Sequence, residues 1–175
     1  KLIDQQKKVL AVVGLLPEGK TADAEITRLF QERLEPRIVA LETGEYVEGL
    51  DPLTFDQRKA AKDPDTSREA PSNPARVRRV PDNALIYVLR EGEEIAALVL
   101  PIEGMGLWST LYGYVALEGD AQTILGLTYY EHGETAGLGG EVDNPRWKAL
   151  WPGRKAFDAN WDPEIAVVKG AAGPP

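Results

Sequence analysis

Cysteine is absent from the 175-residue sequence, which also contains a single histidine, His132. Without cysteine the chain can form no disulfide framework, no thiolate nucleophile and no zinc knuckle, although its compartment remains open. His132 lies near Glu131 and Glu134, but the HExxH spacing of zinc hydrolases is missing, and a Ser-His-Asp triad would have to recruit a loop histidine. We therefore expect no metal site and no catalytic residue, and we interpret His132 as exposed or as a neighbour that supports a site.

Positive charge and long apolar runs are also scarce. The chain has 20 Lys and Arg against 28 Asp and Glu, which gives a formal net charge of -8. Its densest cationic run, from Arg76 to Arg79, is short and follows prolines, so we expect no nucleic-acid partner. No run approaches the roughly 18 to 20 apolar residues of a membrane-spanning helix. The composition predicts a soluble domain, long enough to bury one core.

Both ends of the sequence have the character of interrupted elements. The chain starts at Lys1 and enters LIDQQKKVLAVVGLL directly, with Leu2, Gln6, Val9 and Val13 at helical spacing and no N-cap residue ahead of them. It ends on KGAAGPP, a loop composition that rarely closes a domain. We expect residues 1–175 to be one domain, truncated at both ends.

The first part of that domain, residues 1–83, is predicted to be helical and rich in loops. Thr21 is the expected N-cap of a short amphipathic helix over residues 22–34, which Pro36 should end. A strand is expected over residues 37–41 and a further helix over residues 53–61. Charged residues and four prolines then predict a long surface excursion over residues 62–81.

Strand patterns dominate the second part, residues 84–170. Two β-rich runs, 84–90 and 95–100, flank EGEE, and two more, 112–117 and 123–130, flank EGDAQ. Each pair predicts a β-hairpin. A short helix over residues 145–151, capped by Asn144, and a last strand over residues 165–169 complete the pattern. The order indicates an α+β fold, in which an antiparallel sheet built from hairpins carries N-terminal and flanking helices.

The segment GMGLWSTLYGY, from Gly104 to Tyr114, has the composition of a ligand-contacting turn. Glycines allow close backbone approach, Trp108 offers a flat apolar face, and Ser109 and Thr110 offer hydroxyls to phosphate or ribityl oxygens. The alternative is a strand entry punctuated by glycine, with Trp108 in the core.

A second glycine-rich segment, EHGETAGLGGE, runs from Glu131 to Glu141. A loop of this kind after a strand can turn several backbone N–H groups toward an anion. It lacks the Lys-Ser/Thr pair of a P-loop and the spacing of a dinucleotide fingerprint. By itself this glycine-rich loop is therefore not specific evidence for a phosphate site.

Taken in order, the two segments are more specific than either alone. A glycine, LW with small hydroxyl residues, a YGYVAL strand and a second strand ending in HGETAGLG together resemble the FMN-binding domain found in the C subunit of the sodium-translocating NADH:quinone reductases. The related G subunit of Rnf-type complexes shares the pattern. The resemblance is strongest over residues 84–170. The N-terminal half also fits, because in the C subunit one membrane helix precedes the soluble region, which places Lys1 just after that helix.

The resemblance implies a flavoprotein subunit that relays electrons between the redox centres of a membrane complex. FMN would be joined through its phosphate to a threonine hydroxyl, the partners would be the other subunits of the NADH:quinone reductase, and the domain would face the periplasm from the bacterial inner membrane. Transferred residue by residue, the flavin-binding set comprises two wall residues, five loop residues and one cation: Trp108, Ser109, Glu134, Thr135, Gly137, Leu138, Gly139 and Lys169.

Two departures from the family pattern bear on this expectation. The SGAT motif that holds the family's acceptor threonine does not occur in residues 1–175, so the acceptor role passes to none of Thr110, Thr128 and Thr135. Ala136 stands where the family usually carries proline. The alternative is a noncatalytic extracytoplasmic ligand-binding or assembly module that keeps the fold without the flavin.

Tryptophans gather near the C-terminus in NPRWKALWPGRKAFDANWDPE. Trp147 and Trp151 are four residues apart, and at that spacing on a short helix we favour a packing role over an aromatic binding face. Docking of this segment against a partner subunit is compatible with packing, since tryptophan and arginine are enriched at interfaces.

Overall fold

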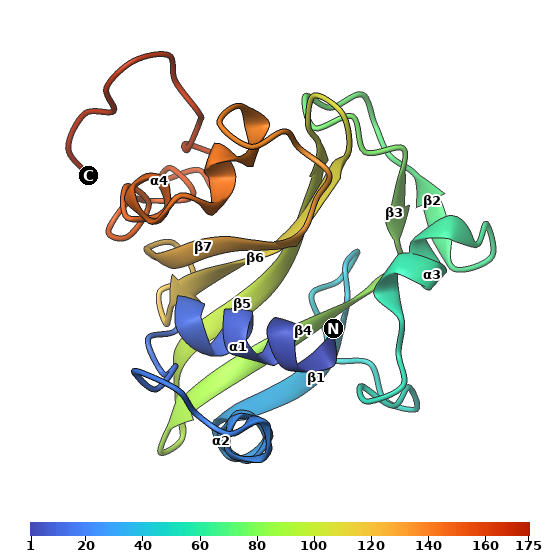
Figure 1. Ribbon diagram of the computed structural model, residues 1–175. Helices are drawn as coiled ribbons and strands as arrows, with labels where there is room; N and C mark the ends of the chain where they lie inside the picture. The colour runs from blue at the N-terminus through green and yellow to red at the C-terminus, as the bar shows by residue number, and fades with distance from the viewer.

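An antiparallel sheet of five strands forms the centre of the computed structural model, which describes residues 1–175. The strands lie in the order β1-β4-β5-β6-β7 (Figure 1). Their bounds are β1 Leu34–Ala40, β4 Asn83–Glu91, β5 Glu94–Met105, β6 Thr110–Glu118 and β7 Ile124–Glu131. Both predicted hairpins, β4–β5 and β6–β7, are confirmed, as is the α+β class. Gly92, at φ +63°, makes the first hairpin turn.

Two helices, α1 (Leu2–Val12) and α2 (Asp23–Arg33), cover one face of the sheet (Figure 1). Both were predicted. Val9, Leu10 and Ile26 are almost fully buried against that face. The other buried hydrophobic residues of this core are Val12, Leu34, Leu89, Ala97, Val99, Tyr114 and Ala116.

The boundary between α2 and β1 differs from the prediction. Ala22, not Thr21, is the N-cap residue, and no side chain caps this helix, whose first turn instead carries Asp23 and Glu25 at the positive end of the helix dipole. The chain then passes from Arg33 directly into β1. Pro36 falls inside that strand, where a proline is tolerated because β1 pairs with β4 on one side only.

The predicted surface excursion contains a small ribbon that the sequence did not indicate. Strands β2 (Ser67–Glu69) and β3 (Arg79–Pro81) pair antiparallel, and Arg79 donates to the Ser67 hydroxyl at 2.8 Å and to its carbonyl at 2.9 Å. Three-residue strands among prolines carry too little alternation to be seen in a sequence. Helix α3 (Gln57–Lys62) begins later than predicted, because Asp56 accepts from the Lys59 N–H and caps it there.

On the opposite face of the sheet, the C-terminal segment covers the β6–β7 hairpin. Leu117, Ile124 and Ala156 are buried there, with Trp151 and Ile165 packed against them. This confirms the packing role of Trp151, whose ring also meets Trp147 edge to face at 5.3 Å. The 3₁₀ turn η1 (Gly139–Asp143) leads into α4 (Pro145–Lys148). As predicted, Asn144 caps α4, by accepting from the Arg146 N–H at 2.9 Å.

The predicted strand over residues 165–169 is wrong. This segment has no strand partner, and Val167 and Val168 are exposed by 75% and 57%. The place beside the start of β7 is taken by residues 153–156 instead, since the Ile124 N–H donates to the Arg154 carbonyl and the Gly153 N–H to the Ile124 carbonyl, both at 2.8 Å. An apolar run becomes a strand only where a sheet edge is free to receive it.

The other outer strand is also engaged on its open side. The Val47 N–H donates to the Ile38 carbonyl at 2.8 Å, and the Ala40 N–H donates to the Glu45 carbonyl at 2.9 Å. Pro36, farther back in β1, offers no N–H at all. Residues 45–47 therefore take up the second half of this edge.

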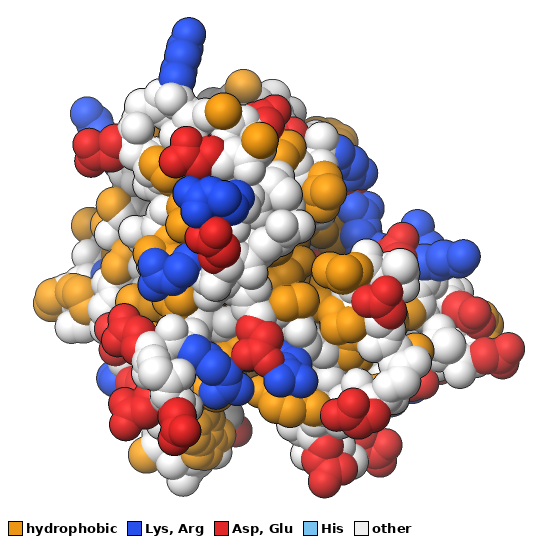
Figure 2. Space-filling model, turned by 90° about the horizontal axis from the view of Figure 1, so that it is seen from below, with side chains coloured by type: hydrophobic (Ala, Val, Ile, Leu, Met, Phe, Trp, Pro, Cys, Tyr) orange, Lys and Arg blue, Asp and Glu red, His pale blue; other side chains and the backbone are white.

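A wide groove of about 980 Å³ lies between α1 and α3, over the end of the sheet where β5 finishes and β6 begins. Tyr87, Tyr112, Tyr114 and Tyr130 line its floor. Figure 2 shows hydrophobic side chains in a hollow right of its centre, with acidic side chains along the lower rim. No helix combines the length and the apolar character required to cross a membrane.

Candidate functional site

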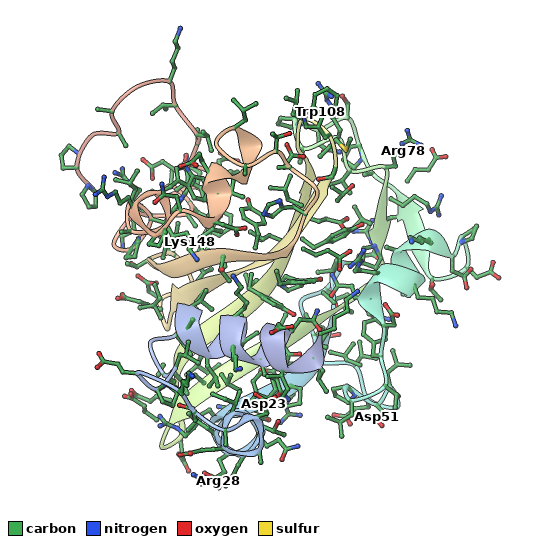
Figure 3. The ribbon with its side chains drawn as sticks, in the orientation of Figure 1. Asp23, Arg28, Asp51, Arg78, Trp108 and Lys148 are labelled. Atoms are coloured by element: carbon green, nitrogen blue, oxygen red, sulfur yellow. The ribbon has the colours of Figure 1, made fainter.

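Two loops that are far apart in the sequence meet at one end of the sheet. One is the turn from Gly106 to Ser109 between β5 and β6, and the other follows β7 from His132 to Gly139. They meet because β6 pairs with both β5 and β7 in antiparallel fashion, so that β6 begins where the other two strands end. Figure 3 places Trp108 at this end, far from α1 and α2. These are the two segments that the sequence singled out.

The Glu134 carboxylate joins the two loops. Its Oε1 accepts from the Trp108 N–H at 3.0 Å and from the Ser109 N–H and hydroxyl at 2.9 Å each. Its Oε2 accepts from the Leu107 N–H at 3.2 Å. Three consecutive backbone N–H groups thus converge on one carboxylate, an arrangement that suits an anion.

Two glycines make room for this carboxylate. A Cβ at Gly106 would lie 2.7 Å from Glu134 Oε1 and would overlap the Leu111 side chain. A Cβ at Gly139 would overlap Glu134 Oε2 and lie 3.0 Å from Glu134 Cβ. Side-chain atoms do not approach so closely, so both glycines are needed by a neighbour within the chain. Gly137 is different, because its φ of +74° favours glycine while the space around it is open.

The charge state of Glu134 follows from its donors. Partial burial alone would raise its pKa, but the Trp108 N–H and the Ser109 hydroxyl and N–H act against this, and the net effect holds the pKa below its usual range. The carboxylate is therefore ionised at neutral pH. An anion inside the protein thus uses N–H groups of the first segment, residues 107–109, whereas the N–H groups predicted to turn toward an anion were those of the second segment, residues 131–141.

Ser109 and His132 extend the connection between the loops. The Ser109 hydroxyl accepts from the Gly133 N–H at 2.8 Å, and His132 Nδ1 accepts from the Glu134 N–H at 3.2 Å. Because Nδ1 is an acceptor, the ring proton lies on Nε2, which donates to Asp143 at 2.8 Å. The side chain of His132 is only 13% exposed. It thus supports the loop, the second of the two roles predicted for it.

The outer surface of the two loops is apolar. Leu107, Trp108 and Leu138 are exposed by 69%, 67% and 66%. Trp108 is consequently not a core residue, which rules out the alternative interpretation of its segment. Exposed large apolar side chains gathered at one place mark a binding surface. A flat aromatic ligand would find both an indole face and aliphatic side chains here.

The structure brings seven of the eight predicted site residues into this region. Trp108, Ser109 and Glu134 are in direct contact, Gly139 lies against Glu134, and the Thr135 carbonyl accepts from the Leu138 N–H at 3.1 Å. The eighth residue, Lys169, is exposed in the C-terminal segment, and its partnership with flavin or phosphate oxygens stays a prediction.

Sequence reasoning missed Leu107 and the inward orientation of Glu134. Leu107 adjoins Trp108 in the same motif, so its place in the turn could have indicated it. The large groove contains none of the eight predicted residues, and its size alone assigns it no chemistry. No group of three or more His, Cys, Asp or Glu side chains is arranged to hold a metal ion.

Comparison with known proteins gives one consistent family. The FMN-binding domain family matches residues 106–173. Over 173 residues the chain is 44% identical to the C subunit of the Na(+)-translocating NADH-quinone reductase of Vibrio vulnificus (strain YJ016), covering 98% of this chain and 66% of the relative. It is 42% identical over 176 residues to the C subunit of the Pseudomonas aeruginosa enzyme, covering 99% and 67%.

Solved structures agree with these sequence matches. The crystal structure of Shewanella oneidensis NqrC superposes with a TM-score of 0.86 at 33% identity, covering 96% of this chain and 76% of that one. The C subunit of the Na(+)-translocating NADH-quinone reductase of Parabacteroides distasonis gives a TM-score of 0.72 at 26% identity, covering 98% and 76%. The chain thus spans about two thirds of the Vibrio and Pseudomonas relatives and about three quarters of the two structures.

Proposed function

This chain belongs to the family formed by the C subunits of the Na(+)-translocating NADH-quinone reductases, the family that its motifs indicated, and on that basis we propose that it carries FMN and transfers electrons within such a membrane complex. The observation that carries the proposal is the apolar surface of Leu107, Trp108 and Leu138, which lies inside the matched FMN-binding region. The protein acts as one subunit of an oxidoreductase and is not catalytic alone.

The residues at the loops fit the ring of a flavin. FMN supplies the redox chemistry when it is bound, and the protein sets its position and electrostatic surroundings. Trp108 and Leu138 offer apolar contact from opposite loops, and Thr135 adds a hydroxyl on the exposed side. The backbone N–H groups of Leu107, Trp108 and Ser109 already donate to Glu134, so they are not available to the phosphate.

The phosphate is proposed to be held covalently, through a phosphoester with a threonine hydroxyl. The support is the family resemblance, in which the acceptor threonine lies in an SGAT-type motif after a VKG-like segment. Val168, Lys169 and Gly170 match that segment, and no SGAT motif occurs in residues 1–175. The proposed acceptor is therefore none of the threonines in residues 1–175.

Acid precipitation of the full-length protein tests the attachment. The protein is produced in a host that contains the flavin-transfer machinery, denatured in acid and collected by centrifugation. Yellow, flavin-like absorbance should remain with the precipitated chain, whereas flavin in the supernatant would show noncovalent binding. A colourless preparation would overturn the FMN proposal and favour the flavin-free binding or assembly module.

We propose the cellular location and the partner subunits of this protein from the same family membership. A membrane helix ahead of Lys1 would anchor the domain in the bacterial inner membrane, with residues 1–175 in the periplasm, and the partners would be the other subunits of the complex. Added protease should digest the domain in spheroplasts of cells that express the full-length protein. Protection of the domain until the membrane is broken would place it in the cytoplasm instead.

A further inference from the structure

From the contacts of Glu134 we infer that this residue positions the flavin site without touching the flavin: its ionised carboxylate holds the Gly106–Ser109 turn closed and so sets the surface of Leu107, Trp108 and Leu138 against which the ring lies. The inference rests on the proposed function for its flavin part. Its structural part, which we call the Glu134 clamp, depends only on contacts within the chain.

The first argument is that both carboxylate oxygens are engaged from within the protein. Oε1 has three donors and Oε2 has one, all of them from residues 107–109. The carboxylate also lies between Gly106 and Gly139, whose missing side chains leave the space that it fills. Glu134 is thus directed into the protein, while the neighbouring Leu138 is directed outward.

The second argument is that the turn depends on an anionic acceptor. Three adjacent N–H groups that point to one place must have an acceptor or reorganise, because an unsatisfied donor is costly. A glutamine at this position presents one oxygen, and its NH₂ group would face an N–H of the turn. An aspartate is one methylene too short to reach across from the other loop. The turn is therefore specific for glutamate.

The third argument links the turn to the ring surface. Leu107 and Trp108 are the residues whose N–H groups the clamp holds, and their side chains are two-thirds exposed. Fixing the peptide groups of the turn fixes the direction in which the Cα–Cβ bond of each residue leaves the backbone. Leu138 belongs to the loop that carries Glu134 itself. The clamp thereby sets the relative position of apolar groups from both loops.

Hydrogen exchange in the full-length protein tests the clamp itself. In flavin-free protein, Glu134→Gln should speed amide exchange at Leu107, Trp108 and Ser109 by about tenfold or more, since each loses its acceptor. Glu134→Asp should do the same. The matched control is Glu141→Gln, which removes a carboxylate of the same segment whose side chain bonds Asn144 instead. Unchanged exchange in Glu134→Gln would overturn the clamp.

Flavin-loaded protein tests the positioning role. The redox potential and the flavin fluorescence should change in Glu134→Gln and in Ser109→Ala, which removes one donor to the carboxylate, and should stay at the wild-type values in Glu141→Gln. Fast exchange with unchanged flavin properties would overturn the positioning role. If wild-type protein takes up no flavin, the proposed function fails, and the exchange rates still decide whether the clamp exists.

Discussion

Gly139 and Gly137 stand two residues apart and are needed for different physical reasons. The first has no room for a side chain beside Glu134, and the second has the room but a left-handed backbone. Glycine-rich loops are often taken for ligand cradles, yet here Gly106 and Gly139 both accommodate one carboxylate. Substitution by alanine can distinguish a glycine that is needed for space from one that is needed for its backbone conformation.

Gly139→Ala should disturb the clamp, whereas Gly137→Ala should not. The added methyl group in Gly139→Ala displaces the carboxylate, at an expected loss of about 1 to 2 kcal/mol in unfolding free energy together with faster exchange at residues 107–109. Gly137→Ala should lose about 1 kcal/mol through backbone strain alone and keep wild-type exchange rates there. Denaturant unfolding and amide exchange measure the two effects. Slow exchange in Gly139→Ala would contradict this account.

Ala121 offers a stabilising substitution in the β6–β7 turn. It is not a glycine, yet its φ is +56°, a conformation that glycine adopts without strain. Ala121→Gly should therefore raise the unfolding free energy by about 0.5 to 1 kcal/mol, after allowance for the greater freedom of glycine in the unfolded chain. Gly92→Ala, at φ +63° in the other hairpin turn, should lower it by a similar amount. Shifts of the same sign in both variants would refute the strain argument.

At this scale the sequence predicted which residues gather at the site and missed how one of them is oriented. The motifs predicted one set that includes Trp108, Ser109 and Glu134, and the structure brings these three into contact, while their role toward a flavin stays a prediction. The direction of the Glu134 carboxylate depends on donors some 25 residues earlier in the chain, and only the pairing of β6 with β5 and β7 brings them near. Long-range pairing of this kind leaves no mark in a local motif.

Helix α1 packs on the sheet at a point where β7 has no side chain. A Cβ at Gly126 would lie 2.9 Å from the Val12 carbonyl oxygen and 3.2 Å from Val12 Cα. The backbone of the helix must therefore move if this glycine is replaced.

Gly126→Ala should lower the unfolding free energy by about 1 to 3 kcal/mol, because it forces α1 away from a well-packed core. Ala11→Ser, on the exposed side of the same helix, should change it by no more than about 0.5 kcal/mol. Guanidinium unfolding followed by circular dichroism measures both. An unaffected Gly126→Ala protein would mean that α1 shifts freely over β7.

Among the elements, hairpins and helices were predictable because their signals are local. Alternating apolar residues around EGEE and EGDAQ were sufficient for four strands. The wrong predictions have tertiary causes. Pro36 lies in an edge strand, where it is tolerated, and Arg79 bonds Ser67 across a short ribbon. Residues 153–156, and not the run at 165–169, lie beside the start of β7.

On the scale of the whole molecule, an ion pair ties the helical part to the sheet. Arg58 of α3 bonds both oxygens of Glu131 at the end of β7, each at 3.1 Å, and stacks over the Tyr112 ring at 3.6 Å. The Arg58 guanidinium and then Lys1 lower the pKa of Glu131 to about 2 from its ordinary 4.5. A lowered folded pKa means that the charged carboxylate stabilises the fold above pH 4.5 and that this contribution is lost as the pH falls toward 2.

The unfolding free energy should therefore decline less steeply between pH 4.5 and about 2 in Glu131→Gln than in the wild type. The effect is small, because both side chains are about one-third exposed and water screens the pair. Arg58→Met should flatten the same part of the curve by removing the partner. Urea titrations at a series of pH values measure it, and parallel curves for all three proteins would exclude the pair as a source of the acid response.

Both outer strands of the sheet are already hydrogen-bonded along part of their free edges, and this limits how a strand of another chain can pair with them. A β-sheet polymerises when a strand of a second chain finds a continuous row of unpaired backbone groups, and amyloid growth and strand capture both use such a row. Pro36 and residues 45–47 interrupt the row along β1, and residues 153–156 cover its beginning along β7. A strand of another chain therefore cannot pair along the whole length of either outer strand.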